Sequence, residues 1–258
     1  MCPSRAHLNL LTLPDFPLVC PGDDLAELIS TSLQKASLKL ENGDVLVIAQ
    51  KIVSKAENRY AYLNQVIPTT KAEQLASEVE KDPRLVQLIL DESKEVVAKR
   101  PGVLIVEHKR GFVHANAGID QSNISSSEND PRVLLLPEDP DKSAEKLCHK
   151  LKTGQLSQLS IIINDSAGRA WRNGSIGFAI GTNGFEALEN MIGHRDLYDR
   201  EMVVTEVAVA DELAAAASFL MGQANESAPV VLIRGAQIKP SNEGSAMLIR
   251  DKHKDLFR

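Results

Sequence analysis

Short apolar runs rich in valine and isoleucine recur along the chain and predict buried β-strands. The runs are DVLVIAQ (44–50), GVLIVE (102–107), LSIIIN (159–164) and PVVLIR (229–234). Almost no polar residue interrupts them, which is typical of strands that are covered on both faces. We therefore expect these runs to form the sheet of the protein.

Between the runs, apolar residues recur at spacings of three and four, which predicts helices that bury one face. The predicted helical segments are 23–36, 70–81, 82–97, 141–154 and 209–222. Asp23 and Asp24 stand at the start of the first, as helix N-caps do, and Gly222 at the end of the last is explained as a C-cap. The serine- and asparagine-rich segment 120–132 reads as an exposed loop.

Strands and helices alternate irregularly, so the sequence predicts an α/β (mixed α+β) fold and does not establish a simple doubly wound sheet. The length of 258 residues and the hydrophobic content of 43% are enough for a real core. We treat 1–258 as a single unit and leave open a division into two subdomains.

Composition excludes several classes of protein. The net charge of -6 argues against the nucleic-acid backbone as a partner. The most apolar long window, VAVADELAAAASFLMG, is too short to span a bilayer and is interrupted by the charged residues Asp211 and Glu212. The cysteines have no metal-ligand or redox spacing, which favours a reduced, cytoplasmic compartment; they are Cys2, Cys20 and Cys148.

Polar residues follow the first predicted strand directly. Gln50, Lys51 and Lys55 come after DVLVIA, with Ser54 between the lysines. Ligands of α/β proteins gather at the carboxyl ends of strands, and lysines with a serine suit a polyphosphate. A solvated loop or helix start, where lysines are ordinary, explains the segment equally well.

A second polar cluster lies in NAGIDQSN, where Asp120 and Asn123 follow small residues. A carboxylate and an amide in a glycine-bearing loop can hold a hard cation and a nucleotide together. An Asx-turn without any ligand is the alternative, because Asp and Asn favour such turns.

The stretch from Ile161 to Gly184 carries the strongest signal. Asp165 and Ser166 follow a predicted buried strand, and oxygen ligands of this kind hold magnesium or manganese together with phosphate. Arg169 and Arg172 suit bidentate contact with phosphate or carboxylate, while Trp171 is explained by packing or stacking. The glycines match neither GxGxxG nor GxxxxGK[ST], so this is no standard nucleotide motif.

Other familiar catalytic patterns are missing from the sequence. The histidines form no HExxH or tight ligand cluster, and we expect each at the surface or in packing. GxSxG is absent and no cysteine has the sequence context of a nucleophile, so the sequence does not support acyl-enzyme hydrolysis.

Taken in order, FPLVCPGDDLAELI, KIVSKAENR, NAGIDQSN, NDSAGRAWRNGSIGFAIGTNG and VADELAAAASFLMG resemble segments of the coenzyme F-420-0:L-glutamate ligase family. The resemblance runs from about Phe16 to about Gly235 and includes LLLPEDPDKSAEKL and GHRDLYDREM. It implies a non-Rossmann nucleotide-binding fold of that type and a homodimer.

The resemblance also implies an activity. Members use GTP to convert the lactyl carboxylate of a deazaflavin precursor, coenzyme F-420-0, into an acyl phosphate that L-glutamate then attacks. Further γ-linked glutamates can follow. Two divalent cations, manganese or magnesium, take part, and potassium is a further candidate ion. Charge neutralisation and alignment, rather than a protein nucleophile, are what phosphoryl transfer requires.

Carried over position by position, the resemblance assigns roles to individual residues. Those expected to bind GTP are Phe16, Pro17, Leu18, Val19, Gln50, Lys51, Lys55 and Asn123. Asp120 and Asp165 would share one metal, and Ser166 with Gln223 would hold the second. Lys55, Asp120 and Asp165 are the expected catalytic residues.

Two departures from the family pattern accompany this assignment. Ser166 stands where threonine is frequent and keeps the hydroxyl, and Gln223 stands where some members have an acid. Two alternatives stay open: a related ligase with a different acid as acceptor, and a nucleotide-binding protein without catalysis.

Overall fold

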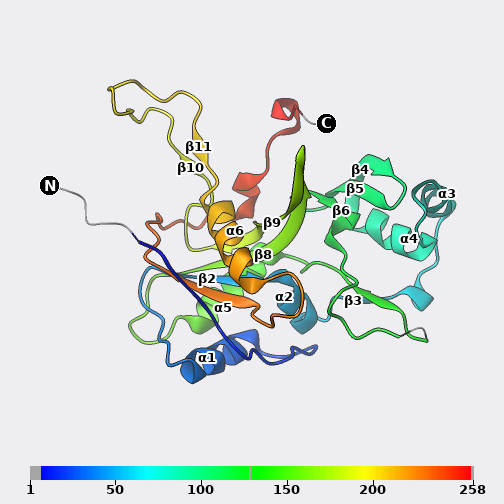
Figure 1. The fold of residues 1–258 in the computed structure, drawn as a ribbon, viewed down its shortest axis with the longest axis horizontal. Helices are drawn as coiled ribbons and strands as arrows, with labels where there is room; N and C mark the ends of the chain where they lie inside the picture. Colours follow the sequence, from blue (N-terminus) through cyan, green and yellow to red (C-terminus); the bar gives the residue numbers. More distant parts are fainter. Residues whose placement is uncertain (1–6, 128, 257–258) are drawn as a thin grey trace.

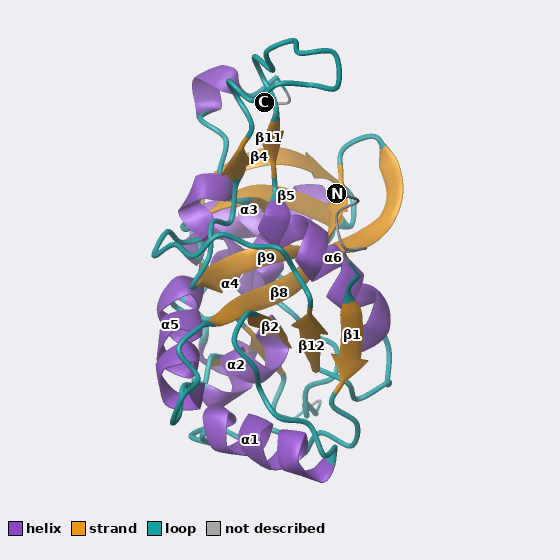
Figure 2. Cartoon of the chain, turned by 90° about the vertical axis from the view of Figure 1, so that its left-hand side faces the viewer, coloured by secondary structure: helices purple, strands orange, loops and turns teal. Residues whose placement is uncertain are grey.

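The computed structural model describes residues 7–127 and 129–256, and a mixed sheet lies at its centre (Figure 1). Among the described residues this sheet has five strands in the order β1, β12, β2, β8, β9, which Figure 2 shows next to one another. Their bounds are β1 (Asn9–Thr12), β2 (Asp44–Ala49), β8 (Leu159–Arg169), β9 (Arg172–Asn183) and β12 (Val230–Arg234). β2 and β8 are parallel and the other neighbours antiparallel. The predicted α/β, mixed α+β class is confirmed.

Helices cover both faces of the sheet. Figure 1 shows α6 (Val209–Met221) above it, and α1 (Leu25–Lys35) and α5 (Pro140–Leu151) below it. Successive side chains of a strand point to opposite faces, so Leu46 and Ile48 join one core cluster while Val45 and Val47 join the other. The uninterrupted apolar runs in the sequence follow from this double coverage.

The prediction that an aspartate caps the first helix is confirmed. The Asp24 side chain caps α1 by accepting a hydrogen bond from the Ala26 N–H at 3.0 Å. Gly177 of β9 lets α6 pack closely, because a Cβ there would lie 2.4 Å from the Ser218 Cβ. The glycines of the 161–184 stretch thus have a packing role at this point.

A second group of elements has a hydrophobic cluster of its own. It contains α3 (Thr70–Val79), α4 (Pro83–Asp91), a sheet of β4 (Ser93–Arg100), β5 (Val103–His108) and β6 (Val113–Ala115), and the pair β3 (Tyr60–Tyr62) and β7 (Arg132–Leu134). Ile89, Leu104 and Val106 are fully buried in this cluster. We call these elements the second lobe. Whether the lobe is a separate subdomain stays a prediction.

The second lobe corrects two sequence predictions. The run 102–107 forms β5, which belongs to the three-stranded sheet of the lobe and not to the main sheet. The helix predicted over 82–97 ends at Asp91, and Ser93–Arg100 is a strand. Val96 and Val97 continue the helical spacing, but they lie in the antiparallel ladder with β5, where Val96 pairs with Val106 and Val97 lies at a register shift. Gly102, at φ 78°, is in the connecting turn.

Several short elements complete the fold. β10 (Glu189–Asn190) pairs with β11 (Glu206–Val207) at the base of a long loop that projects away from the body in Figure 1. Short 3-10 turns occur at Leu63–Gln65, Asn116–Gly118, Ser245–Leu248 and Lys252–Lys254. In the described parts of the chain, no helix has the length and apolar character needed to cross a membrane. Cys148 is buried, Cys20 is exposed, and Cys2 lies outside the described residues.

Candidate functional site

The candidate site lies where the parallel pair β2 and β8 ends. The last paired residues are Ala49 and Asn164, after which Gln50 starts α2 (Gln50–Ala56) and Asp165 follows in β8. Because parallel strands end at the same edge of a sheet, the polar residues after them meet there. The prediction that β8 stops at Asn164 is wrong: the strand shifts register there and continues to Arg169, paired with β9.

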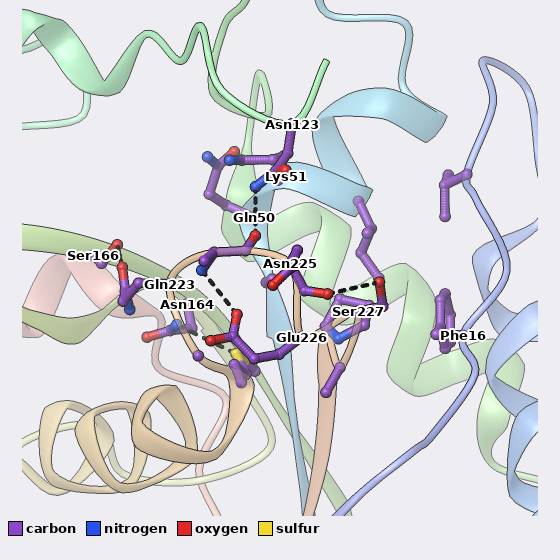
Figure 3. A pocket seen from close by; sticks show the side chains of 18 of the residues that line it. Phe16, Gln50, Lys51, Asn123, Asn164, Ser166, Gln223, Asn225, Glu226 and Ser227 are labelled. Atoms are coloured by element: carbon purple, nitrogen blue, oxygen red, sulfur yellow. Dashed lines mark hydrogen bonds between the residues drawn. The ribbon is translucent and has the colours of Figure 1, made fainter. Parts of the chain in front are cut away.

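A cavity of about 330 Å³ opens at this edge, and Figure 3 shows the side chains around it. It brings together every residue that the sequence resemblance placed in the nucleotide and metal sites. These are Phe16, Pro17, Leu18, Val19, Gln50, Lys51, Lys55, Asp120, Asn123, Asp165, Ser166 and Gln223. Their convergence from five separate segments is shown; their individual roles stay predictions.

The segment Phe16 to Val19 forms an apolar wall of the cavity. Phe16 and Val19 are buried in the core beneath the sheet, whereas the intervening Leu18 is 90% exposed. The two buried side chains therefore anchor the segment and leave Pro17 and Leu18 available to a bound molecule.

Lys51 and Asp120 form an ion pair at the cavity. Lys51 Nζ lies 2.7 Å from Asp120 Oδ2, and it also donates to the Ser122 hydroxyl at 3.0 Å. Asp120 Oδ1 accepts from the Ser122 N–H at 2.8 Å. Burial raises the pKa of Asp120, but the hydrogen bonds from Lys51 and Ser122 outweigh it and hold the pKa below its ordinary value. The Asp120 carboxylate is thus ionised, and the positive charge of Lys51 balances it.

Lys55 lies one helical turn beyond Lys51 and has a different environment. Its Nζ donates to the Asn123 carbonyl oxygen at 2.8 Å, and no carboxylate of the described residues pairs with it. Burial and the nearby charge of Lys51 lower the pKa of Lys55. Asn123 has φ 53° and donates from Nδ2 to the Ala224 carbonyl at 2.9 Å, which joins two loops over the cavity.

Ser166 and Gln223 contact each other at the opposite end of the site. The Ser166 hydroxyl donates to Gln223 Oε1 at 3.0 Å, and Gln223 Nε2 donates to the Ser218 hydroxyl at 3.2 Å. The two residues predicted to hold the second metal are therefore adjacent, and the bond to Ser218 of α6 fixes which Gln223 atom faces Ser166.

Asp165 contacts a histidine that the sequence did not single out for the site. His114 Nε2 of β6 lies 3.1 Å from Asp165 Oδ2, with side-chain exposures of 9% and 13%. The atoms are poorly aligned for a hydrogen bond, so the contact is an ion pair. Burial lowers the pKa of His114, but Asp165 and the Ala115 carbonyl outweigh it and raise the pKa. No local signal predicted this contact, because β6 belongs to the second lobe.

The comparisons with known proteins agree with this arrangement. The family model of F420-0:Gamma-glutamyl ligase matches residues 15–235. Proteins named coenzyme F420:L-glutamate ligase are similar over their whole length. One from Methanococcus maripaludis is 43% identical and covers 100% of both chains, and one from Methanothermobacter thermautotrophicus is 42% identical over 97% of this chain and 99% of its own. The one from Archaeoglobus fulgidus is 42% identical over 98% and 97%.

The chain belongs to the F420-0:gamma-glutamyl ligase family.

The oxygen atoms of this ligase-family site fit a divalent cation that takes part of its ligands from phosphate. Within residues 7–127 and 129–256, no three His, Cys, Asp or Glu side chains are grouped so that they could hold a metal ion by themselves. Asp120 and Asp165 supply two carboxylates, and Asp165 Oδ2 is buried without a hydrogen-bond partner among the described residues. Magnesium and manganese commonly bind through one or two carboxylates plus substrate phosphates. Asp120, Asp165, Ser166 and Gln223 would hold the cations.

The loop after α6 adds cavity residues that the sequence reading did not assign. Glu226 accepts a hydrogen bond from the Ala224 N–H at 2.8 Å, and Asn225 and Ser227 line the cavity beside it (Figure 3). Gly222 caps α6 as predicted, at φ 73°, and a Cβ there would lie 2.1 Å from the Glu226 Cδ. The glycine therefore also makes room for the Glu226 carboxylate.

Arg169, Trp171 and Arg172 lie outside the cavity lining, at the tip of the hairpin of β8 and β9. Trp171 has φ 56° and is 81% exposed, so it does not pack in the core. Arg169 donates to the Gly174 carbonyl at 3.1 Å across the hairpin. The family resemblance of this stretch thus covers two places, a site at the root and an exposed tip.

Proposed function

We propose that the protein is a coenzyme F420:L-glutamate ligase, which joins L-glutamate to the lactyl carboxylate of the precursor coenzyme F-420-0. The observation that carries the proposal is the full-length identity of 42% to 43% with proteins of that name. The cavity supports it, because residues from five segments of the family pattern converge there.

The proposed reaction uses GTP in two steps. An oxygen of the precursor carboxylate attacks the γ-phosphorus of GTP, which gives an acyl phosphate and GDP. The α-amine of L-glutamate then attacks the acyl carbon, so that an amide forms, inorganic phosphate leaves and the amine loses a proton. Repetition on a glutamate γ-carboxylate would add γ-linked residues. Neither step needs a covalent bond to the protein.

The side chains at the cavity suit this chemistry. Lys55 is a charged donor without a carboxylate partner in the described chain, so it is free to neutralise phosphate. Lys51 can exchange Asp120 for a phosphate oxygen. Asp120 and Asp165 would hold the cation that neutralises charge developing on the transferred group. The apolar wall from Phe16 to Val19, which presents Pro17 and Leu18, would exclude water from one side of the nucleotide.

Product analysis tests the proposal. The purified protein with GTP, Mn²⁺, L-glutamate and the precursor should give a product heavier by one glutamyl unit, together with GDP and phosphate. Asp165→Asn is the matched control, since it keeps the shape of the side chain. GDP formation only with other carboxylic acids would indicate a related ligase, and GTP binding without turnover on any acid would indicate a non-catalytic protein.

We also propose that two copies of the chain associate through the loop between β10 and β11. This loop projects from the body and exposes Leu197 (99%), Val204 (80%), Tyr198 (79%) and Val203 (70%), and exposed apolar side chains gathered in this way mark contact sites between proteins. Light scattering should give twice the chain mass, and Leu197→Asp with Val204→Asp should halve it while leaving the circular dichroism unchanged. A monomeric wild type would refute the proposal.

Bound potassium and a cytoplasmic location stay predictions.

A further inference from the structure

His114 is the buried titratable side chain nearest the site that the proposed reaction does not use. Its ring is 9% exposed and both ring nitrogens face oxygen atoms. Nδ1 lies 2.8 Å from the Ala115 carbonyl oxygen, to which it donates, and Nε2 lies 3.1 Å from Asp165 Oδ2. The bond to the backbone fixes the ring with Nε2 beside the carboxylate.

Aromatic neighbours hold the His114 ring in this orientation. Phe112 meets it edge-on at 6.5 Å between ring centres, and Phe178 of β9 lies 5.7 Å away. Phe178 is also the register partner of Asp165 on the neighbouring strand. The ring and the carboxylate are therefore set by the same part of the hairpin and cannot move independently.

Asp165 is held at both of its oxygen atoms. Oδ1 accepts from the Ser166 N–H at 2.8 Å, while Oδ2 faces His114. A carboxylate oxygen has two lone-pair positions, so each atom keeps one for a ligand after these contacts. Such second contacts orient metal-binding carboxylates, and their loss typically weakens metal binding.

We propose that His114 is a positioning residue, which holds the Asp165 carboxylate in the orientation that binds the divalent cation. The proposal rests on the metal-dependent function proposed above. Plain packing does not explain the ring, because a packed histidine has no need to place a nitrogen against a carboxylate at the cavity. The ion pair also ties the second lobe, through β6, to the root of β8.

His108 provides a matched control in the same cluster. It is 4% exposed and stacks on Phe112 at 4.8 Å, but its nearest carboxylate is Glu92, at 3.8 Å, and it does not line the cavity. His108→Phe and His114→Phe therefore make the same change of ring in the same aromatic group, and only one of them removes a contact with Asp165.

The test is a titration of the full-length protein with Mn²⁺ in the presence of a non-hydrolysable GTP analogue, followed by the electron paramagnetic resonance of the free ion. The protein-free mixture is subtracted, and Asp165→Asn identifies the part of the binding that depends on Asp165. His114→Phe should raise the Kd for Mn²⁺ by about 10- to 100-fold. His108→Phe should leave it unchanged, and His114→Gln, which keeps an N–H donor, should recover most of the loss.

The outcomes separate the two proposals. Suppose that Mn²⁺ binding depends on Asp165. If His114→Phe then binds Mn²⁺ as tightly as the wild type, or if His108→Phe loses as much affinity as His114→Phe, the positioning role is wrong and the metal site stands. If Asp165→Asn binds Mn²⁺ as well as the wild type, the metal site itself is wrong, and the positioning role fails with it. Thermal unfolding reports whether His114→Phe folds; if it does not, His114→Leu compared with His108→Leu decides, because leucine also removes both ring nitrogens.

Discussion

The two carboxylates of the cavity have different surroundings. Asp120 pairs with Lys51, a long side chain that can swing away, and both are 23% exposed. Asp165 faces His114, whose ring is held by a backbone bond and by aromatic neighbours, and both are more deeply buried. The partner of Asp120 could turn to bind a phosphate, whereas the partner of Asp165 is fixed in place.

The difference indicates a division of tasks. In the proposed function, Lys51 would neutralise Asp120 until a nucleotide binds, and the cation and the phosphates would then assemble together on that side. Asp165 needs no rearrangement, because its orientation is set by the root of the hairpin before any ligand binds. Preorganised groups of this kind lower the free energy needed to reorganise the site during reaction.

The largest expected effect is at Asp165. Asp165→Asn keeps the side-chain shape and removes the charge of the fixed carboxylate, so kcat should fall roughly 100- to 1,000-fold, in keeping with the several kcal/mol that a positioned cation contributes. Steady-state GDP release at saturating Mn²⁺ measures it. Near-normal kcat with an unchanged melting temperature would remove Asp165 from the chemistry.

The aromatic group around His114 also predicts a pH dependence of stability, through its second histidine, His108. Burial, followed by the charges of His114 and Arg110, lowers the pKa of His108 from 6.5 to about 4. The unfolded chain takes up this proton below about pH 6.5 while the folded chain does not until about pH 4, so about 3 kcal/mol of unfolding free energy should be lost in that interval. Urea unfolding of the wild type and His108→Phe at pH 7.5 and 5 measures the difference, which should shrink in the variant. Parallel losses in both proteins would show that His108 is not the cause.

Lys55 should matter more for the nucleotide than Lys51 does. Lys55→Ala removes a charged donor that has no carboxylate partner in the described chain, so the KM for GTP should rise about tenfold or more, as expected for a lost charge-assisted hydrogen bond. Lys55→Arg is the control for charge. An unchanged GTP titration would exclude Lys55 from the phosphate site.

Lys51→Ala should have the smallest effect, with opposite signs for the two ligands. Without nucleotide, loss of the ion pair frees Asp120, so Mn²⁺ should bind about two- to fivefold more tightly, because a partly exposed pair contributes at most about 1 kcal/mol. GTP should bind more weakly. Calorimetric titration with each ligand separately tests this, and weaker Mn²⁺ binding would mean that Lys51 supports the cation instead of competing with it.

Local sequence patterns predicted the elements that depend on local rules. The runs at 44–49 and 230–233 became buried strands because both faces of the main sheet are covered, and Asp24 became an N-cap because its carboxylate reaches a free N–H of the first helical turn. The segments carrying the candidate site were also found in the sequence. The polar residues after 44–49 and 159–164 stood out by their type, whereas Phe16 to Val19 and Gln223 were found only through the family resemblance. Glu226 was missed because a single acid in a loop has no distinguishing spacing.

Non-local pairing decided the rest. Residues 93–100 have apolar spacing that continues α4, yet they form β4 because the ladder with β5 satisfies their backbone groups and the turn at Gly102 permits it. The run that became β5 reads like the strands of the main sheet, and only its partners β4 and β6 place it in the second lobe.

The sequence by itself determined which residues could carry the chemistry, since charge, hydroxyl and amide groups placed after apolar strands are written in the order of the chain. The tertiary structure alone decided which of them meet. The parallel pairing of β2 and β8 puts Gln50 and Asp165 at one edge, and the packing of β6 against β8 puts His114 on Asp165. Contacts between residues 51 positions apart depend on how strands pair, and spacing along the chain does not encode that pairing.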